Sequence, residues 1–473
     1  MSPAASLAST LARRLGAELV ETHISWILLT PALAYKLKKP VHLPFVDYST
    51  LERRRHFCEE EVRLNQRLAP ALYLGVSRVT GTPDAPSIDG PGETLDWAVR
   101  MRRFPPGALF SERVAAGTLT AASVARFAAR LAHFHAGAPR LQSPAPGGQL
   151  LQRALAALAG CEALLAPEER ERLQQWIASE GEPLEPFWAA RRAAGFVREC
   201  HGDLHLANIL ELDGDVVAFD CIEFDAGLRF IDVVEEVAFP LMDFAAQGQP
   251  ALGWRFLDGW LEATGDYEGV AGLRLALVYR ALVRATVENL RSPGSAAART
   301  YARHALAWSR PGEPALCITH GLPGSGKTFR SQAWLEARGA IRIRSDVERK
   351  RMHGLQAQAD SRAAGLAIYT HDATRRTYER LFVLARIALR AGFPVVLDAA
   401  FLRRDERAAA RALAVQLGVP FKILDCDAPP EVLRARLAQR RGDASEADAE
   451  VLAALAAAAE PLDADERAAA CPP

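Results

Sequence analysis

The stretch Ala315-Leu-Cys-Ile-Thr-His-Gly-Leu-Pro-Gly-Ser-Gly-Lys-Thr328 decides the fold of the carboxy-terminal part of the chain. Residues 321–328 match the pattern G-x-x-x-x-G-K-[ST], between an apolar run at 315–319 and a helical pattern at 329–338. A strand, a glycine-rich loop and a helix in this order form a phosphate cradle, because backbone N–H groups and the helix N-terminus converge on phosphate oxygens. The alternative is a glycine-rich turn that binds nothing.

This context is that of a P-loop, in which the lysine reaches the β- and γ-phosphates and the following hydroxyl ligates Mg²⁺. The sequence therefore predicts a site for ATP, or another nucleoside triphosphate, together with Mg²⁺. We expect Lys327 to be a catalytic residue and Thr328 a metal ligand. The predicted phosphate-binding residues are Gly321, Gly324, Ser325, Gly326, Lys327 and Thr328.

Two further segments supply candidate residues. The apolar run 393–401 contains Asp398 at the point where a parallel strand would present it to a ligand, which predicts a metal-binding acid. A plain strand-terminal aspartate is the alternative. In 341–352, Asp346 and Arg349 share one helical face if a helix begins at Ser345.

A carboxylate among cations can accept the proton of an acceptor hydroxyl while the cations hold phosphate. This predicts Asp346 as a catalytic base and Arg344 and Arg349 as substrate-binding residues, whereas a capped helix with solvated charges is the alternative. Farther on, Arg436 and Arg440 are expected to bind the nucleotide from a mobile lid. A solvated helix face is the competing interpretation there.

These motifs resemble the P-loop kinase group of gluconate kinases, zeta-toxin-like kinases and polynucleotide 5′-kinases over roughly residues 315–450. In polynucleotide kinases an Arg-Asp-x-x-Arg-like element carries the base and a substrate-phosphate arginine. Asp346 and Arg349 match this spacing, although Ser345 precedes Asp346 and Arg344 stands one residue further back. The resemblance implies kinase chemistry and names no substrate.

A second set of motifs lies at 201–220, which reads His-Gly-Asp-Leu-His-Leu-Ala-Asn and then ILELDGDVVAFD. The Asp-Gly pair between two β-rich runs predicts a hairpin with a two-residue turn. Counting outward from this turn places Asn208 opposite Phe219 and diagonal to Asp220, so that the two side chains can share one Mg²⁺. Asp203 is the predicted catalytic base, as in the protein-kinase catalytic loop, and His201 is expected to orient the loop.

This stretch resembles the catalytic loop of the aminoglycoside phosphotransferase and choline kinase-like families, with a likeness covering about residues 15–305. The resemblance implies Lys36 as the strand lysine on the nucleotide phosphates, with Lys38 as its substitute. It implies Glu61 as the lysine's partner, with Glu60 close behind. A solvated charge run is the alternative for these residues.

The chain departs from that pattern at Glu235-Glu236, where such kinases carry Asp-hydrophobic-Ala, which leaves the support of the catalytic loop open. Glu223 and Asp225 are left as either metal or structural contacts. The whole arrangement resembles bacterial fusions of the two kinase families.

The expected fold is an α+β, protein-kinase-like bilobal domain followed by an α/β P-loop domain with a parallel sheet. The expected boundaries are residues 1–308 (N-lobe to about 103, then a helical C-lobe), a linker at 309–314, the P-loop domain at 315–460 and a flexible tail at 461–473. The 473-residue length fits more than one domain.

Charge and cysteine content limit the binding partners and the cellular location that can be expected. Lys+Arg and Asp+Glu number 57 each, so no global positive field gathers nucleic acid or a membrane surface. Seven scattered cysteines without C-x-x-C spacing indicate neither a disulfide framework nor a zinc site, and a cytoplasmic location is expected.

The leading hypothesis is a bifunctional, ATP- and Mg²⁺-dependent phosphotransferase whose two halves each act on a hydroxyl acceptor, with a small molecule favoured. One alternative makes one half, more readily the amino-terminal one given Glu236, a nucleotide or ligand sensor. Another makes the P-loop half a polynucleotide 5′-kinase. The arginines at 342–351 favour this alternative, whereas the net charge of zero weighs against it. The sequence leaves the oligomeric state open.

Overall fold

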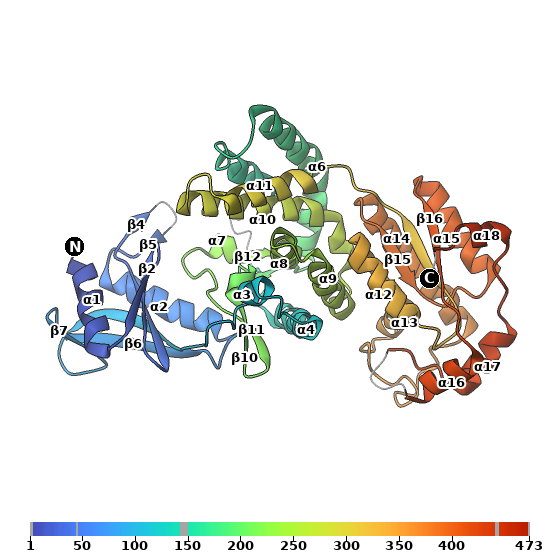
Figure 1. Cartoon of the computed structure of the whole chain (residues 1–473), viewed down its shortest axis with the longest axis horizontal. Coiled ribbons are helices and arrows are strands. Elements are labelled where there is room, and N and C mark those ends of the chain that lie inside the picture. The colour runs from blue at the N-terminus through green and yellow to red at the C-terminus, as the bar shows by residue number, and fades with distance from the viewer. Residues whose placement is uncertain (1–2, 44–45, 142–149, 440–443, 472–473) are drawn as a thin grey trace. The chain divides into compact units, whose positions relative to one another are not determined.

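The computed structural model describes residues 3–43, 46–141, 150–439 and 444–471 (Figure 1). The chain divides into two compact units. Unit 1 comprises residues 1–149 and 185–240, and unit 2 comprises residues 150–184 and 241–473. The linker predicted at 309–314 lies between α11 (Ala296–Trp308) and β13 (Leu316–His320); the predicted domain boundaries themselves stay a prediction.

Unit 1 is built on a six-stranded antiparallel sheet with the strand order β1-β2-β3-β8-β6-β7. Its strands are β1 (Glu18–Glu21), β2 (Ser25–Leu29), β3 (Leu33–Lys38), β6 (Tyr73–Thr82), β7 (Ala85–Ile88) and β8 (Thr94–Arg102). Helix α1 (Pro3–Leu15) packs against β7, and α2 (Leu51–Asn65) packs against β6 and β8. A short pair, β4 (His42–Leu43) and β5 (Val46–Asp47), precedes α2.

Helix α2 buries a face that is largely polar. Thr50 caps the helix, because its hydroxyl accepts from the Arg53 N–H at 3.2 Å. The buried residues of the helix are Arg54, Cys58, Glu61, Leu64 and Asn65. The charged ones tolerate burial because the sheet supplies partners: Arg54 Nε donates to Asp96 Oδ1 at 2.8 Å, and Glu61 meets two lysines of β3.

The hairpin predicted around Asp213-Gly214 is present, with the predicted register. Strand β10 (Ile209–Leu212) pairs antiparallel with β11 (Asp215–Ala218), with Leu212 opposite Asp215. Asp213 and Gly214 both have positive φ, 53° and 83°, as a type I′ turn requires. Beyond the strands the Phe219 N–H donates to the Asn208 carbonyl at 3.0 Å, so Asn208 lies opposite Phe219.

The remaining elements of residues 104–308 are mostly helical. They are α3 (Phe110–Ala115), α4 (Ala121–Gly137), α5 (Leu150–Ala159), α6 (Pro167–Ala193), β9 (Val197–Glu199), α7 (Ala226–Arg229), β12 (Phe230–Asp232), α8 (Val233–Ala246), α9 (Pro250–Thr264), α10 (Val270–Arg291) and α11. Strands β9 and β12 pair antiparallel. Helices α5 and α9 to α11 belong to unit 2, and α6 and α8 run across the division between the units.

Unit 2 contains a four-stranded, fully parallel sheet in the order β14-β15-β13-β16, which confirms the predicted α/β architecture. Its strands are β13, β14 (Ile341–Arg344), β15 (Val395–Asp398) and β16 (Phe421–Asp425), and its helices are α12 (Lys327–Arg338), α13 (Ser345–Met352), α14 (His371–Arg390), α15 (Arg404–Leu417), α16 (Pro430–Gln439), α17 (Ala449–Ala457) and α18 (Ala464–Ala468). The central strands are apolar and buried, as parallel strands covered by helices must be.

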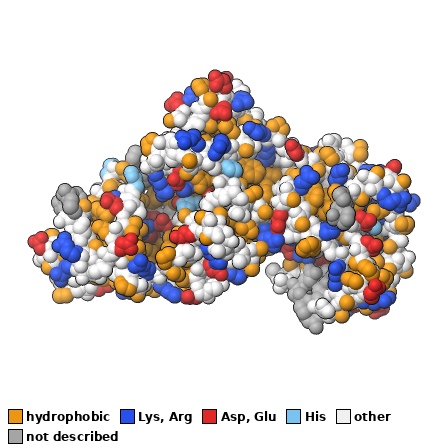
Figure 2. Space-filling view, viewed as in Figure 1, with side chains coloured by type: hydrophobic (Ala, Val, Ile, Leu, Met, Phe, Trp, Pro, Cys, Tyr) orange, Lys and Arg blue, Asp and Glu red, His pale blue; other side chains and the backbone are white. Residues whose placement is uncertain are grey.

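The two charge signs are interspersed over the visible face of the molecule (Figure 2), in keeping with equal numbers of acidic and basic residues. Within the described ranges, no helix combines the length and the apolar character that crossing a bilayer requires.

The carboxy-terminal segment differs from the flexible tail that the sequence predicts. Its α18 carries Glu466, and the Arg407 guanidinium of α15 donates to this carboxylate at 2.8 and 3.1 Å. Arg407 is about 1% exposed, so Glu466 is the partner that makes its burial possible. The Cys471 N–H also donates to the carbonyl of Ile423 at 2.8 Å, which attaches the segment to β16.

We expect Glu466→Ala to lower the free energy of unfolding by about 3 kcal/mol or more, because it leaves the Arg407 charge buried without its carboxylate. Denaturant unfolding of the full chain measures this. Asp465→Ala is the matched control, since Asp465 is the neighbouring acid in the same short helix and is exposed. Equal stability of the two variants would contradict the proposed anchoring.

Candidate active sites

The first site lies in unit 1, where one lysine of β3 meets two carboxylates. Lys36 Nζ lies 3.0 Å from Glu61 Oε1 of α2 and 2.5 Å from Asp220 Oδ1, just after β11. Burial disfavours the lysine's charge, but Asp220 and Glu61 outweigh it and hold the pKa of Lys36 well above its ordinary value. Lys36 is thus a fixed cation beside the predicted metal-binding aspartate.

Lys38 points to the same side of β3 but serves a different set of contacts. Its side chain has no exposed surface, and its Nζ lies 2.7 Å from Glu61 Oε2 and in contact with Glu223. The Tyr48 hydroxyl also donates to Glu223, at 2.5 Å. Lys38 therefore binds the Glu61 oxygen that does not face Lys36, and Glu223 is a structural partner of Lys38.

The sequence offered Glu60 as a second choice for the partner of the strand lysine and left Asp225 as a metal or a structural contact. In the structure each of these two acids has a local partner. Glu60 pairs with Arg63 on the same helix. Asp225 caps the short helix α7, where its carboxylate accepts from the Gly227 N–H at 2.7 Å. Neither contact places the side chain at Lys36.

The loop 201–208 brings Asp203 and Asn208 together. Asn208 Nδ2 donates to the Asp203 carbonyl at 2.9 Å and lies 3.4 Å from Asp203 Oδ2. This use of the amide nitrogen leaves Oδ1 of Asn208 as the atom that can face a cation. Asp203 is partly exposed and also lies 3.5 Å from His205 Nε2.

His201 orients this loop, as predicted, through a single tautomer. Its Nε2 lies 2.8 Å from the Phe219 carbonyl, which requires an N–H there, and its Nδ1 accepts from the Asp203 N–H at 3.3 Å. Burial lowers the pKa of His201, which favours the neutral ring that both contacts need. The ring thereby connects the loop to the end of the β10–β11 hairpin.

Asp220 adopts a conformation that non-glycine residues avoid, with φ of 63°. Its N–H donates to the Tyr73 hydroxyl at 3.2 Å. Such strain persists where the surroundings fix the backbone, and it occurs most often at functional sites. Here it directs the carboxylate toward Lys36.

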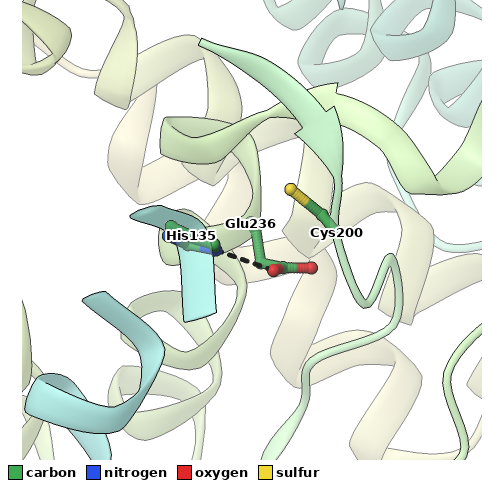
Figure 3. Close-up of side chains that lie close together, drawn as sticks. All are labelled: His135, Cys200 and Glu236. Carbon is green, nitrogen blue, oxygen red and sulfur yellow. Dashed lines mark hydrogen bonds and ion pairs between the residues drawn. The ribbon is translucent and has the colours of Figure 1, made fainter. Parts of the chain in front are cut away.

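Glu236 supports the loop, which settles the question raised by the Glu235-Glu236 sequence. Its Oε1 accepts from the N–H groups of His201 at 2.6 Å and Gly202 at 2.8 Å. Its Oε2 lies 2.9 Å from His135 Nε2 of α4 (Figure 3). Burial raises the pKa of Glu236, but these neighbours outweigh that effect and lower it, so the carboxylate is ionised.

His135, Glu236 and Cys200 lie close enough to be considered as a metal site, with candidate ligand atoms within 4.8 Å of one another (Figure 3). Both oxygens of Glu236 are already engaged by hydrogen-bond donors. Burial raises the pKa of the Cys200 thiol well above its usual range, which disfavours the thiolate that a metal needs. His135 and Glu236 thus form a hydrogen-bonded support for the loop rather than part of a metal centre.

The second site is the P-loop of unit 2, between β13 and α12. Gly321, Gly324 and Gly326 have φ of 140°, 85° and 95°, which residues with a Cβ rarely adopt. At Gly321 a Cβ would lie 2.1 Å from the Cys426 carbonyl oxygen. Lys327 Nζ donates to the carbonyls of Gly321 and Leu322, at 2.9 Å each, so it folds back over the loop.

A cavity of 1020 Å³ opens at this loop, and most of the residues predicted for the second site line it. Predicted residues that line it are Gly324, Gly326, Lys327, Thr328, Arg344, Asp346, Arg349, Asp398 and Arg436. Arg436 donates to the Gly324 carbonyl at 3.0 Å, within reach of the loop. The predicted lid residue Arg440 lies outside the described residues.

Asp346 and Arg349 both lie on α13, as predicted, and the segment 366–370 lines the same cavity. Arg349 NH1 donates to the Ile368 carbonyl at 3.2 Å and to Thr374 Oγ1 at 3.0 Å, and its guanidinium lies 5.0 Å from the centre of the Tyr369 ring. Burial, followed by the charge of Asp346, raises the pKa of Tyr369. Asp346 and Arg349 thus both line the cavity.

Three other basic residues of the segment 342–351 have partners within unit 2, and they are Arg342, Lys350 and Arg351. Arg342 NH2 donates to Asp258 at 2.6 Å, and Lys350 Nζ lies 3.0 Å from Glu446. Arg351 contacts Glu348 and the Glu262 carbonyl. Of the arginines at 342–351, Arg344 and Arg349 line the cavity.

Both sites have the donor atoms that Mg²⁺ prefers, which are hard oxygens. Asn208 and Asp220 offer them in unit 1, and Thr328 and Asp398 in unit 2. In the P-loop, Ser325 Oγ is buried and has no hydrogen-bond partner among the described residues, as expected of a group whose partner is a ligand. The residues of both sites thus fit Mg²⁺ and a nucleoside triphosphate.

Comparison with known proteins defines the family. The uncharacterized protein Rv2004c of Mycobacterium tuberculosis is 30% identical over 450 residues, which cover 92% of this chain and 89% of that protein. The uncharacterized protein Mb2027c of Mycobacterium bovis gives the same values. The chain belongs to the Rv2004c family.

A family described as an AAA domain matches residues 316–462 of this Rv2004c-family member. Among solved structures, a sugar kinase from Janibacter is 20% identical and covers 33% of this chain and 83% of its own, with a TM-score of 0.26. A choline/ethanolamine kinase family protein from Mesorhizobium loti is 12% identical, covers 62% and 92%, and has a TM-score of 0.37. An aminoglycoside 2′-phosphotransferase is 13% identical, covers 62% and 90%, and also scores 0.37. Likenesses at these scores carry no argument about activity.

We expect Glu236→Ala in this Rv2004c-family chain to speed amide hydrogen exchange at His201 and Gly202 by about 10-fold or more, because each N–H loses a hydrogen bond to a charged group. Hydrogen–deuterium exchange with peptide-level mass spectrometry measures this. Glu236→Gln is the matched control, since it keeps an oxygen acceptor and should remain closer to the parent. Unchanged exchange in Glu236→Ala would show that the loop is held by other contacts.

Proposed function

We propose that the chain is a bifunctional, ATP- and Mg²⁺-dependent phosphotransferase, in which each half transfers the γ-phosphoryl group to a hydroxyl acceptor. The observation that carries the proposal is that each compact unit holds its own cation, acid and base for this chemistry. In unit 1 these are Lys36, Asp220 and Asp203, and in unit 2 they are Lys327, Asp398 and Asp346. A cytoplasmic location fits a reaction that consumes ATP.

In the amino-terminal reaction, Asp203 accepts the proton of the acceptor hydroxyl. The acceptor oxygen bonds to the γ-phosphorus while the bond between the γ-phosphorus and the bridging β-phosphate oxygen breaks. Lys36 binds nucleotide phosphates, and Glu61 holds it in place. Asn208 and Asp220 would hold Mg²⁺, which when bound neutralises charge on the phosphates. His201 and Glu236 keep the loop of Asp203 in one conformation.

In the carboxy-terminal reaction, backbone N–H groups of the P-loop and Lys327 bind the β- and γ-phosphates. Thr328 and Asp398 would hold Mg²⁺, and Arg436 closes over the triphosphate. Asp346 accepts the acceptor's proton, while Arg344 and Arg349 bind negative charge on the substrate. ADP leaves as the second product of each half.

Two alternatives lose support. Glu236 was the reason to favour the amino-terminal half as a sensor, yet its carboxylate accepts two hydrogen bonds from the catalytic loop. The polynucleotide 5′-kinase hypothesis needs a row of arginines for backbone phosphates, yet Arg342 and Arg351 are engaged inside the fold. A small hydroxylated acceptor is therefore favoured for the P-loop half.

We expect Asp203→Ala to lower one phosphotransfer activity by about 10²- to 10⁴-fold and Lys327→Ala to remove the other, since each half has separate machinery. Transfer of ³²P from [γ-³²P]ATP to a panel of metabolites and oligonucleotides measures both. Lys422→Ala, a change at an exposed lysine of β16, is the control and should retain both activities. Loss of both activities in either active-site variant would refute independent halves.

We expect no detectable oligonucleotide binding by a preparation that turns over ATP. If Arg344 and Arg349 instead bound a strand's phosphates, counterion release would give a log–log salt slope of roughly −0.7 for each phosphate. Affinity would then fall about 7-fold between 50 and 200 mM salt. A fluorescence-anisotropy titration over that range decides the matter, and a slope that flattens in Arg349→Ala would establish the nucleic-acid acceptor.

A further inference from the structure

Helix α9, which precedes the predicted linker in the chain, packs on the P-loop part of unit 2 (Figure 1). A Cβ on Gly339, the αL residue that ends α12, would lie 2.8 Å from the Trp254 indole of α9. Arg255 of the same helix lies 2.5 Å from Glu336 of α12. The two helices are thus fitted to one another at a glycine and joined by an ion pair.

The same helix presents two acids to β14. Asp258 and Glu262 are four residues apart and so share one face of α9. Arg342 and Arg344 are two residues apart in β14 and so point to one side of the sheet. Arg342, about 5% exposed, donates to Asp258 at 2.6 and 3.1 Å, and Arg344 NH1 donates to Glu262 Oε1 at 2.9 Å.

Each of these two arginines also lies beside a residue predicted to bind the metal ion of the P-loop site. Arg342 NH1 donates to the carbonyl of Thr328, the predicted metal ligand, at 3.3 Å. Arg344 lies opposite Asp398 in the β14–β15 register, with Nε 3.8 Å from Asp398 Oδ2. That distance is longer than a hydrogen bond, whereas the contact of Arg344 with Glu262 is a hydrogen bond.

We propose that Glu262 is a positioning residue of the P-loop site, and the proposal rests on the phosphotransfer function proposed above. Its carboxylate holds Arg344 at the cavity wall, beyond hydrogen-bond distance of Asp398. Asp398 Oδ2 accepts from Ser331 Oγ at 3.1 Å, so Oδ1 is the oxygen that stays available to a metal ion. Asp258 anchors the neighbouring Arg342 beside Thr328. A helix outside the P-loop motif thereby sets the metal affinity of that site.

The test uses the full chain carrying Lys36→Ala and Asp220→Asn, which removes both members of one ion pair and disables the amino-terminal site. ADP binding is titrated by calorimetry at increasing Mg²⁺. In this background Glu262→Gln should raise the half-saturating Mg²⁺ concentration by about 10-fold or more, because Arg344 then turns to Asp398 and competes with the metal. ADP affinity without Mg²⁺ should stay unchanged.

Two further variants separate positioning from folding. Glu379→Gln removes an exposed carboxylate that pairs with Arg375 at 2.6 Å on α14, and it should leave the Mg²⁺ dependence as in the parent. Adding Arg344→Gln to Glu262→Gln removes the competing cation and should restore Mg²⁺ affinity toward the parent value. A merely structural role would leave the double variant no better than Glu262→Gln alone.

The outcomes are distinct. An unchanged Mg²⁺ dependence in Glu262→Gln, or no recovery in the double variant, overturns the role of Glu262 while leaving the P-loop function intact. Absence of Mg²⁺-dependent ADP binding in the parent background overturns the proposed function of this half and the inference with it. A shift that Arg344→Gln reverses supports the inference.

Discussion

The Glu61 carboxylate has no exposed surface, and an ionised group in that position is tolerated only because two lysines of β3 surround it. The same constraint recurs at Glu236, Asp258 and Glu466, each of which is buried against donors from a distant part of the sequence. Removing a charge from water costs several kcal/mol, so each of these pairs fixes two segments in one relative position. Buried charge pairs therefore help to determine where the site residues lie.

Local patterns predicted the elements whose geometry depends on neighbours in sequence. The P-loop follows from its spacing because three glycines must adopt backbone conformations that other residues avoid. The register of the β10–β11 hairpin follows from Asp213-Gly214, since a two-residue turn leaves a single way to pair the strands. Asn208, Asp220 and Lys36 could be placed from these features and from family resemblance.

Features that depend on distant partners could not be placed in this way. The burial of Arg54 and Asn65 on α2 could not be read from the sequence, because such polar side chains are expected to face solvent until their partners in the fold are known. Glu236 was taken as a weakness of the catalytic loop, since no spacing reveals that its carboxylate reaches the N–H groups of His201 and Gly202. The segment after residue 460 reads as polar and Ala-rich, and only the burial of Arg407 explains why it docks.

The contact between α9 and β14 has a consequence for how this protein can be divided. The sequence predicts a boundary at 309–314, but a fragment that begins there would keep Arg342 and lose Asp258, its buried counter-charge. The smallest piece that carries the P-loop together with all its charge partners includes α9, and therefore part of the helical region that resembles another family. Recombination that moved the P-loop part to a new host would have to bring this helix along or replace both arginines.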